Sequence, residues 1–217
     1  TWLALRHFAR WMAAASPANS SRHLFLLGKG VVPSEGGVFY RRNGEGGLNL
    51  IPTSSRSVSA NLLTADYVNN DFTAHLNTGC LTATTPAQVM AYLAKVREYD
   101  ALGDQPWRKN VLHLVGGETP DEFVRFRGYM DKYKYHVESP LFGGKVATIE
   151  RTSLNGTGTS LIVRTNIAPY LNPGLGLISY FGHGSNTSFA LDIGDVNDPS
   201  NGYNNTNGKY PVLFYNG

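Results

Sequence analysis

The sequence is poor in cysteine, in charged residues and in long apolar runs. Cys80 is its single cysteine among 217 residues, which excludes an internal disulfide and any metal cluster built from several thiolates. Only 16% of the residues are charged, the net charge is +3, and no basic run is longer than a pair such as Arg41-Arg42, so a nucleic-acid-binding surface is not indicated. No apolar run approaches the roughly 18 residues of a membrane-spanning helix.

What the chain does contain is enough to build a core. Hydrophobic residues make up 41% of the sequence and aromatic residues 12%. The 24 glycines, together with many Asn, Ser, Thr and Tyr residues, are more typical of an exported surface protein than of a cytosolic enzyme. The first residues show no signal-peptide pattern. Because the sequence starts within an expected helix and stops within an expected strand, we expect it to be a piece of a longer protein.

The first half alternates helical and strand patterns. Residues 1–15 have Leu5, Phe8 and Met12 at helical spacing with Arg6 on the other side, and residues 23–27 form an apolar run that predicts a strand. A capping box at Thr85–Gln88 predicts the start of a helix. The Gly- and Pro-containing residues 100–108 then favour a boundary between two domains, 1–105 and 106–217.

The second half repeats this alternation more clearly. Strands are predicted at residues 111–115, 145–149, 177–181 and 211–217. Helices are predicted after a capping box at Thr119–Glu122 and at Ser160–Leu171. Phe123, Phe126 and Met130 form the expected buried face of the first of these helices. Such an order predicts an α/β fold with a mostly parallel sheet flanked by helices.

Three predicted strand ends carry residues suited to chemistry. Ligands bind beyond the carboxyl ends of parallel strands, where this sequence has Gly116-Gly117-Glu118, Gly182-His183-Gly184-Ser185 and Asn216-Gly217. His183 is the candidate general base, because its flanking glycines let a substrate backbone approach. Gly182, Ser185, Asn216 and Gly217 are the candidate substrate-binding residues. The alternative is that His183 is a structural residue of a glycine turn.

The nucleophile that would partner His183 is not evident from the residues alone. No Gly-x-Ser-x-Gly motif is present, and a single cysteine such as Cys80 is more often a small buried hydrophobe than a nucleophile. The other histidines show no ligand spacing, so no metal site is predicted. Asp66 and Asp71 lack the spacing of a calcium-binding EF-hand loop, and Gly28-Lys29-Gly30 lacks that of a phosphate-binding loop.

Two segments together resemble the catalytic region of the gingipain-type cysteine peptidases. They are Gly176-Leu-Ile-Ser-Tyr-Phe-Gly-His183-Gly-Ser185-Asn-Thr-Ser-Phe189 and Pro211-Val-Leu-Phe-Tyr-Asn-Gly217. The first half resembles the N-terminal subdomain of that family, except that Cys80 stands where members often carry arginine. The loop at Asp198–Asn201 is most similar to large Bacteroidetes proteins described as sortase-like peptidases of the type IX secretion system.

The resemblance implies a caspase-like fold in two subdomains and a Cys-His dyad. His183 would activate a cysteine expected immediately after Gly217, so the 217 residues alone are expected to be inactive. The backbone N–H of Gly184 would help to bind the oxyanion. Glu118 lies near the place of the acidic residue that orients the histidine in the family. No cofactor is implied beyond, at most, a structural calcium ion.

The implied partner is a peptide or protein substrate, with other type IX secretion components as further partners and a secreted or outer cell-surface location. Whether the enzyme hydrolyses the acyl-enzyme or transfers it to an amine depends on water access. A binding module that keeps the fold and holds a peptide or glycan is the alternative from a different class. The residue after Gly217 discriminates between these two. A third possible function is that of a phosphate-binding enzyme that uses Gly28–Gly30 or Gly116-Gly117.

Overall fold

The chain divides into two compact units, residues 1–93 and 94–217. The computed structural model describes residues 2–15, 22–30, 50–51, 61–66, 71–151, 163–184, 189–204 and 208–216. The two units divide within helix α4 (Pro86–Ala101), whereas the expected domain boundary lies after residue 105.

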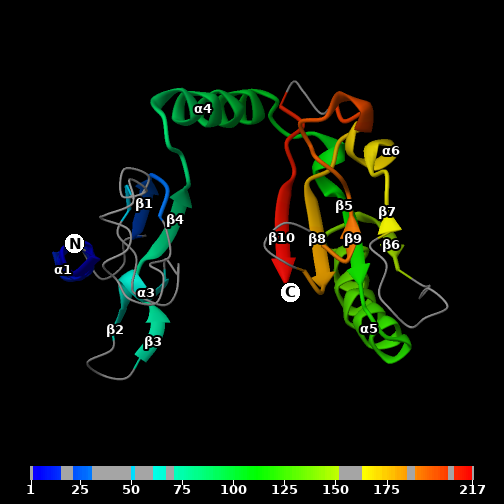
Figure 1. Cartoon of the computed structure of the whole chain (residues 1–217), viewed down its shortest axis with the longest axis horizontal. Helices are drawn as coiled ribbons and strands as arrows, with labels where there is room; N and C mark the ends of the chain where they lie inside the picture. The colour runs from blue at the N-terminus through cyan, green and yellow to red at the C-terminus, as the bar shows by residue number, and fades with distance from the viewer. Residues whose placement is uncertain are drawn as a thin grey trace, which may run out of the picture. The chain divides into compact units, whose positions relative to one another are not determined.

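The first unit contains two small pairs of strands (Figure 1). Strands β1 (His23–Leu27) and β4 (Asn77–Leu81) are parallel, and β2 (Ala65–Asp66) and β3 (Asp71–Ala74) are antiparallel. Helices α1 (Trp2–Ala15) and α3 (Asn61–Thr64) complete it, with the first part of α4. Its core is formed by Ala9, Leu24, Leu26, Leu63 and Leu76.

Helix α1 differs from its prediction on one side. Ala9 is buried, but Phe8 is half exposed, and Arg6, expected on the polar side, is buried. The Arg6 guanidinium donates a hydrogen bond to the Ala65 carbonyl at 3.2 Å. Arg6 lies three residues before Ala9 and therefore on the same face of the helix, so it can reach the core edge only by pairing with a backbone carbonyl.

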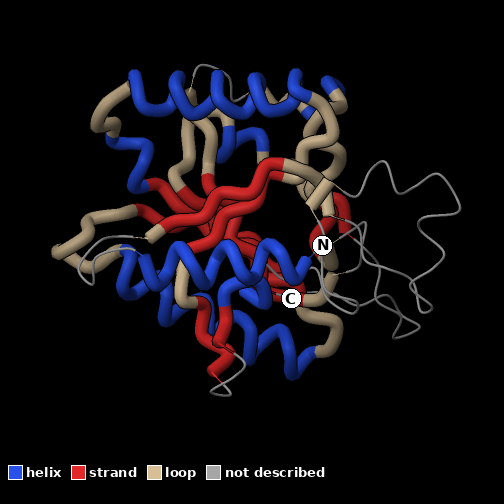
Figure 2. The backbone as a smooth tube through the Cα atoms, turned by 90° about the vertical axis from the view of Figure 1, so that its left-hand side faces the viewer, coloured by secondary structure: helices blue, strands red, loops and turns tan. Residues whose placement is uncertain are grey.

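The second unit is built on a four-stranded parallel sheet of order β10-β8-β5-β6. The strands are β5 (Asn110–Gly116), β6 (Lys145–Glu150), β8 (Leu177–Gly182) and β10 (Val212–Asn216). The predicted α/β fold with a parallel sheet flanked by helices is confirmed. In Figure 2 the strands are coloured red and the helices blue.

Helix α5 (Pro120–Val137) packs against one face of this sheet, with Met130 buried beneath it. The other face is covered by helix α6 (Ala168–Leu171) and the short strand β9 (Leu191–Asp192). Successive residues of a strand point to opposite faces, so Leu112 and Leu114 belong to the α6 side. The core on that side consists of Leu112, Leu114, Ile167, Leu171, Leu175, Ile178, Tyr180 and Leu191.

The helix predicted at Ser160–Leu171 is wrong over most of its described length. Val163–Arg164 form strand β7, which pairs in parallel with β9, and the helix begins only at Ala168. The Asn166 side chain accepts a hydrogen bond from the Ala168 N–H at 2.8 Å and so favours a start there. Residues 160–162 lie outside the described residues. Pairing with a strand distant in sequence has overridden the local helical pattern.

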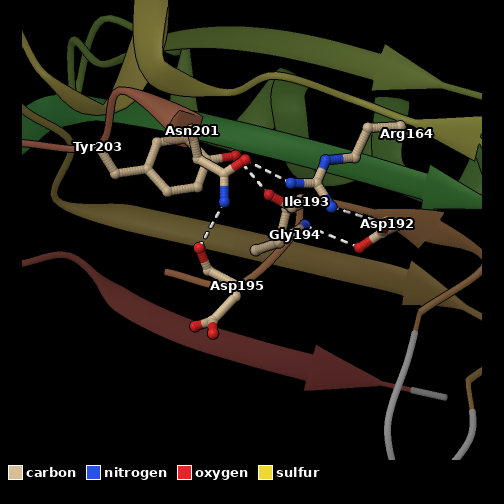
Figure 3. A network of polar contacts seen from close by, with 7 residues as sticks. All are labelled: Arg164, Asp192, Ile193, Gly194, Asp195, Asn201 and Tyr203. Atoms are coloured by element: carbon tan, nitrogen blue, oxygen red, sulfur yellow. Dashed lines mark hydrogen bonds and ion pairs between the residues drawn. The ribbon is translucent and has the colours of Figure 1, made fainter. Parts of the chain in front are cut away.

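The segment after β9 is tied together by a polar network that includes the 3-10 helix η4 (Pro199–Asn201) and is drawn in Figure 3. Arg164 donates to Asp192 Oδ2 at 3.0 Å and to the side-chain oxygen of Asn201. The Gly194 N–H donates to Asp192 Oδ1 at 2.7 Å, and the Tyr203 hydroxyl to the Ile193 carbonyl. These contacts link β7, β9 and the following loop, while Leu191 of β9 belongs to the core and Ile193 and Tyr203 pack against it.

The described part of the chain has neither a membrane-spanning helix nor a metal-binding cluster. No helix there has both the length and the apolar character needed to cross a membrane. No group of three or more His, Cys, Asp or Glu residues there is arranged to hold a metal ion. Asp66 and Asp71, considered above as calcium ligands, are opposite each other on β2 and β3.

Candidate active site

The predicted strand ends meet at one edge of the second unit's sheet. Gly116 at the end of β5 is level with Gly182 at the end of β8, and Asn216 at the end of β10 is level with Phe181. A β-carbon on Gly182 would lie 2.6 Å from Gly116 Cα, so the two strands can approach this closely because residue 182 is glycine. Ser185 and Gly217 lie outside the described residues.

His183 leaves this edge with a half-exposed imidazole. Its backbone N–H donates to the Gly116 carbonyl at 3.0 Å, which fixes the residue to the end of β5. Its Nε2 lies 3.1 Å from Oε1 of Glu122, in the first turn of α5. The ring of Phe126, one turn further along α5, lies 5.7 Å from the imidazole, centroid to centroid. The imidazole is thus held on two sides and open to solvent on the rest.

Glu122 is positioned by the turn that starts α5. Thr119 caps the helix by accepting the Glu122 N–H at 3.3 Å, which confirms the predicted capping box. The other carboxylate oxygen, Oε2, accepts the Glu118 N–H at 3.0 Å. This backbone bond first, and the His183 contact second, lower the pKa of Glu122 from its ordinary value. Glu122 is therefore ionised at neutral pH.

The carboxylate that contacts His183 thus belongs to Glu122, and Glu118, the expected acidic partner, contributes its backbone N–H to that carboxylate. A sequence signal for Glu122 exists, but it is the capping box, which explains a glutamate there without any functional role. Because an ionised carboxylate can only accept, Nε2 of His183 is the donor in this contact, and a neutral imidazole in this arrangement has its lone pair on Nδ1. Such a pair can take up a proton at Nδ1 and stabilise the resulting imidazolium.

Beneath His183 lies Tyr180, which is completely buried. Its hydroxyl donates to the His183 carbonyl and accepts the Ala190 N–H at 3.1 Å. Its ring stacks on Phe189 at 4.8 Å and on Tyr215 of β10 at 5.4 Å. Burial raises the pKa of Tyr180 to about 12, so the phenol is neutral at neutral pH and keeps its proton for donation.

The other sequence candidates belong to the first unit. Cys80 is an exposed residue of β4 in the first unit, and partial burial raises the pKa of its thiol, which does not favour a thiolate. The N–H groups of Gly28 and Lys29 already donate to the carbonyls of Leu81 and Ala83, at 2.8 and 3.0 Å. They are therefore not arranged to bind a phosphate.

Comparison with solved structures gives a match to a crystal structure of gingipain R, described as an Arg-specific cysteine proteinase. The TM-score is 0.65 at 13% sequence identity, which shows a shared fold. The match covers 99% of this chain and 45% of that one, so the chain spans less than half the length of the matched protein. A search of curated proteins gave no match. The sequence profile of peptidase family C25 matches residues 1–217, and the chain therefore belongs to peptidase family C25.

Proposed function

We propose that this chain carries the base side of a cysteine peptidase active site, with His183 as the general base and Glu122 as the residue that orients it. The observation that carries the proposal is the contact between Glu122 Oε1 and His183 Nε2 at the carboxyl edge of the parallel sheet. Family membership supplies the class of reaction, the attack of a thiolate on a peptide carbonyl.

The register of β10 supports a nucleophile directly after Gly217. Tyr215 is level with Tyr180 and Asn216 with Phe181, so a strand continuing in this register brings the position after Gly217 level with His183. Neighbouring strands are about 4.8 Å apart, and side chains of level residues point to the same face. A cysteine at that position would therefore face the imidazole.

The proposed reaction has two steps. Nδ1 of His183 takes the thiol proton, the thiolate attacks the scissile carbonyl, and the Gly184 N–H with the N–H of the cysteine binds the oxyanion. The tetrahedral intermediate collapses, the C–N bond breaks, and the imidazolium gives its proton to the leaving amine. Water, or an amine acceptor in a transfer reaction, then releases the acyl group. Gly182, Ser185, Asn216 and Gly217 would contact the substrate backbone, and no cofactor is needed.

A thiol-directed covalent peptide probe tests the proposal on a chain extended beyond residue 217. We expect labelling at a single cysteine after Gly217, with His183→Ala lowering its rate roughly 100-fold or more, the usual scale of general-base catalysis. The matched control is His136→Ala, since His136 is an exposed histidine on α5. A residue other than cysteine after Gly217, or equal labelling of both variants, would refute the proposal and favour a binding module.

We further propose that the parent protein acts on peptides or proteins at the outer cell surface or after secretion. The glycine-rich, weakly charged composition supports that location. Adding an amine acceptor to the same assay tests transfer against hydrolysis. An acceptor-linked product supports a sortase-like transfer reaction, and free acid alone supports hydrolysis. Other type IX secretion components are the further partners that we propose.

A further inference from the structure

The peptide bond between His183 and Gly184 joins the two proposed catalytic groups, and one buried side chain contacts it. The carbonyl of this peptide belongs to His183, and the N–H belongs to Gly184, the proposed oxyanion donor. The Tyr180 hydroxyl donates a hydrogen bond to that carbonyl. The proposed function does not use Tyr180, although it is among the most completely buried large side chains of the described residues.

Several contacts hold the Tyr180 hydroxyl in one place. It accepts the Ala190 N–H at 3.1 Å, and the same N–H lies 2.9 Å from the His183 carbonyl. Stacking on Phe189 and Tyr215 fixes the ring. Gly116 lies against the phenol, and a β-carbon there would collide with the hydroxyl. The Tyr180 hydroxyl oxygen is therefore enclosed by residues of the sheet edge and of the segment that follows it.

A hydrogen bond to a carbonyl oxygen draws electron density out of the amide and makes the N–H of the same peptide a stronger donor. Gly184 pairs with Phe189 in a single antiparallel bridge, in which the Ala190 N–H donates to the His183 carbonyl. Among the described residues, no backbone carbonyl accepts the Gly184 N–H.

We propose that Tyr180 is a positioning residue whose hydroxyl fixes and polarises the His183–Gly184 peptide group, so that the Gly184 N–H binds the oxyanion more strongly. This proposal rests on the proposed function, because it assumes the oxyanion role of Gly184. The effect on the peptide itself does not depend on that assumption and can be measured without catalysis.

The peptide can be observed alone by isotope labelling. No other histidine of the 217 residues is followed by glycine, so ¹³C-carbonyl histidine with ¹⁵N-glycine labels a single peptide bond. In Tyr180→Phe the Gly184 amide proton should move upfield. Tyr203→Phe is the matched control, because Tyr203 also donates to a backbone carbonyl, that of Ile193, and should leave the resonance in place.

Kinetics on the extended chain supply the second readout. We expect Tyr180→Phe to lower kcat roughly tenfold with KM unchanged, since a weakened oxyanion donor acts on the transition state, and Tyr203→Phe to change neither. A folded Tyr180→Phe with an unmoved Gly184 resonance, or with unchanged kcat, overturns the proposal. If His183→Ala were fully active, the proposed function would fail instead, while the shift of the Gly184 resonance would still be tested.

Should Tyr180→Phe fail to fold, 3-fluorotyrosine at position 180 keeps the ring and the hydroxyl and makes the phenol a stronger donor. The Gly184 amide proton should then move downfield with kcat at least equal to that of the unmodified chain. An unmoved resonance in this variant would also overturn the proposal.

Discussion

Glu122 and His183 are 61 residues apart in the sequence, yet Oε1 of one lies 3.1 Å from Nε2 of the other. The contact forms because α5 starts shortly after the end of β5, and β5 pairs with β8, which ends at Gly182, directly before His183. It therefore depends on a strand pairing between distant segments and on the first turn of one helix. Its role can be tested separately from that of the fold.

Replacing Glu122 by Gln should lower kcat/KM of the extended chain by roughly 10- to 100-fold, because the amide holds Nε2 of His183 without a compensating charge for the imidazolium. The control is Asp121→Asn, which removes one negative charge from the same helical turn. Peptide hydrolysis by the purified variants measures the effect. A loss in Glu118→Gln with none in Glu122→Gln would instead assign the orienting role to Glu118.

Replacing Gly182 by Ala should lower the free energy of unfolding by roughly 1–3 kcal/mol, because the added methyl meets the backbone of Gly116 and the strands must separate. Gly128→Ala in α5 is the opposite case, since nothing lies within 4 Å of its β-carbon position. It should stabilise the helix by about 0.5–1 kcal/mol. Urea denaturation of both variants provides the measurement, and equal stability would contradict the close strand approach.

His113, buried in β5, should make the second unit sensitive to acid. Burial, and after it the charge of Lys134, lowers its pKa below the ordinary 6.5, with Arg127 acting in the same direction and Asp131 and Glu138 against it. The unfolded state therefore binds the proton first as the pH falls. The stability that neutral His113 contributes is complete above about pH 6.5 and declines as the pH falls below that value.

Denaturation between about pH 5 and 7.5, where histidine titrates, checks this expectation. His113→Leu should flatten the decline, whereas His136→Leu, at an exposed position, should keep it. A His113→Leu variant with the slope of the unsubstituted chain would place the proton uptake elsewhere.

Arg164→Gln should cost less than about 1 kcal/mol of stability, because the ion pair with Asp192 is half exposed. Asp192→Ala should cost more, since Asp192 also accepts the Gly194 N–H, the main cause of its lowered pKa. The difference between Arg164→Gln and the unsubstituted chain should shrink as salt is raised to about 1 M. A salt-independent difference would mean that Arg164 acts through packing.

The strands and capped helices can be predicted from the sequence because their signals are local. The runs at residues 111–115 and 177–182 are buried strands, and Thr85 and Gln88 form the expected capping box, with the Thr85 N–H donating to Gln88 Oε1 at 3.3 Å. The parallel sheet follows from the alternation of these elements. Local periodicity was sufficient to predict a helix or strand wherever no segment distant in sequence imposed a different structure.

The remainder depends on contacts that local patterns do not encode. The strand at Val163–Arg164 exists because β9 pairs with it, and Arg6 is buried because the Ala65 carbonyl accepts from it. The sequence predicts only a helix-capping role for Glu122. Its contact with His183 requires the pairing of β5 with β8, which the sequence pattern does not show. The residues whose structure or role the sequence patterns miss are therefore those that depend on a contact between two segments distant in the sequence.

The alternation of side chains along β8 also determines which length changes this region can accept. Tyr180 and His183 differ by an odd number of residues, so the phenol packs on the α6 side while the imidazole turns to α5. Deleting one residue within β8 would turn the His183 imidazole away from Glu122. It would also place a residue other than Tyr180 under the His183–Gly184 peptide. Insertions in the segment between β9 and β10 leave that parity intact. We therefore expect the catalytic geometry to tolerate a change of length after Asp192 better than a change in the spacing from Leu177 to His183.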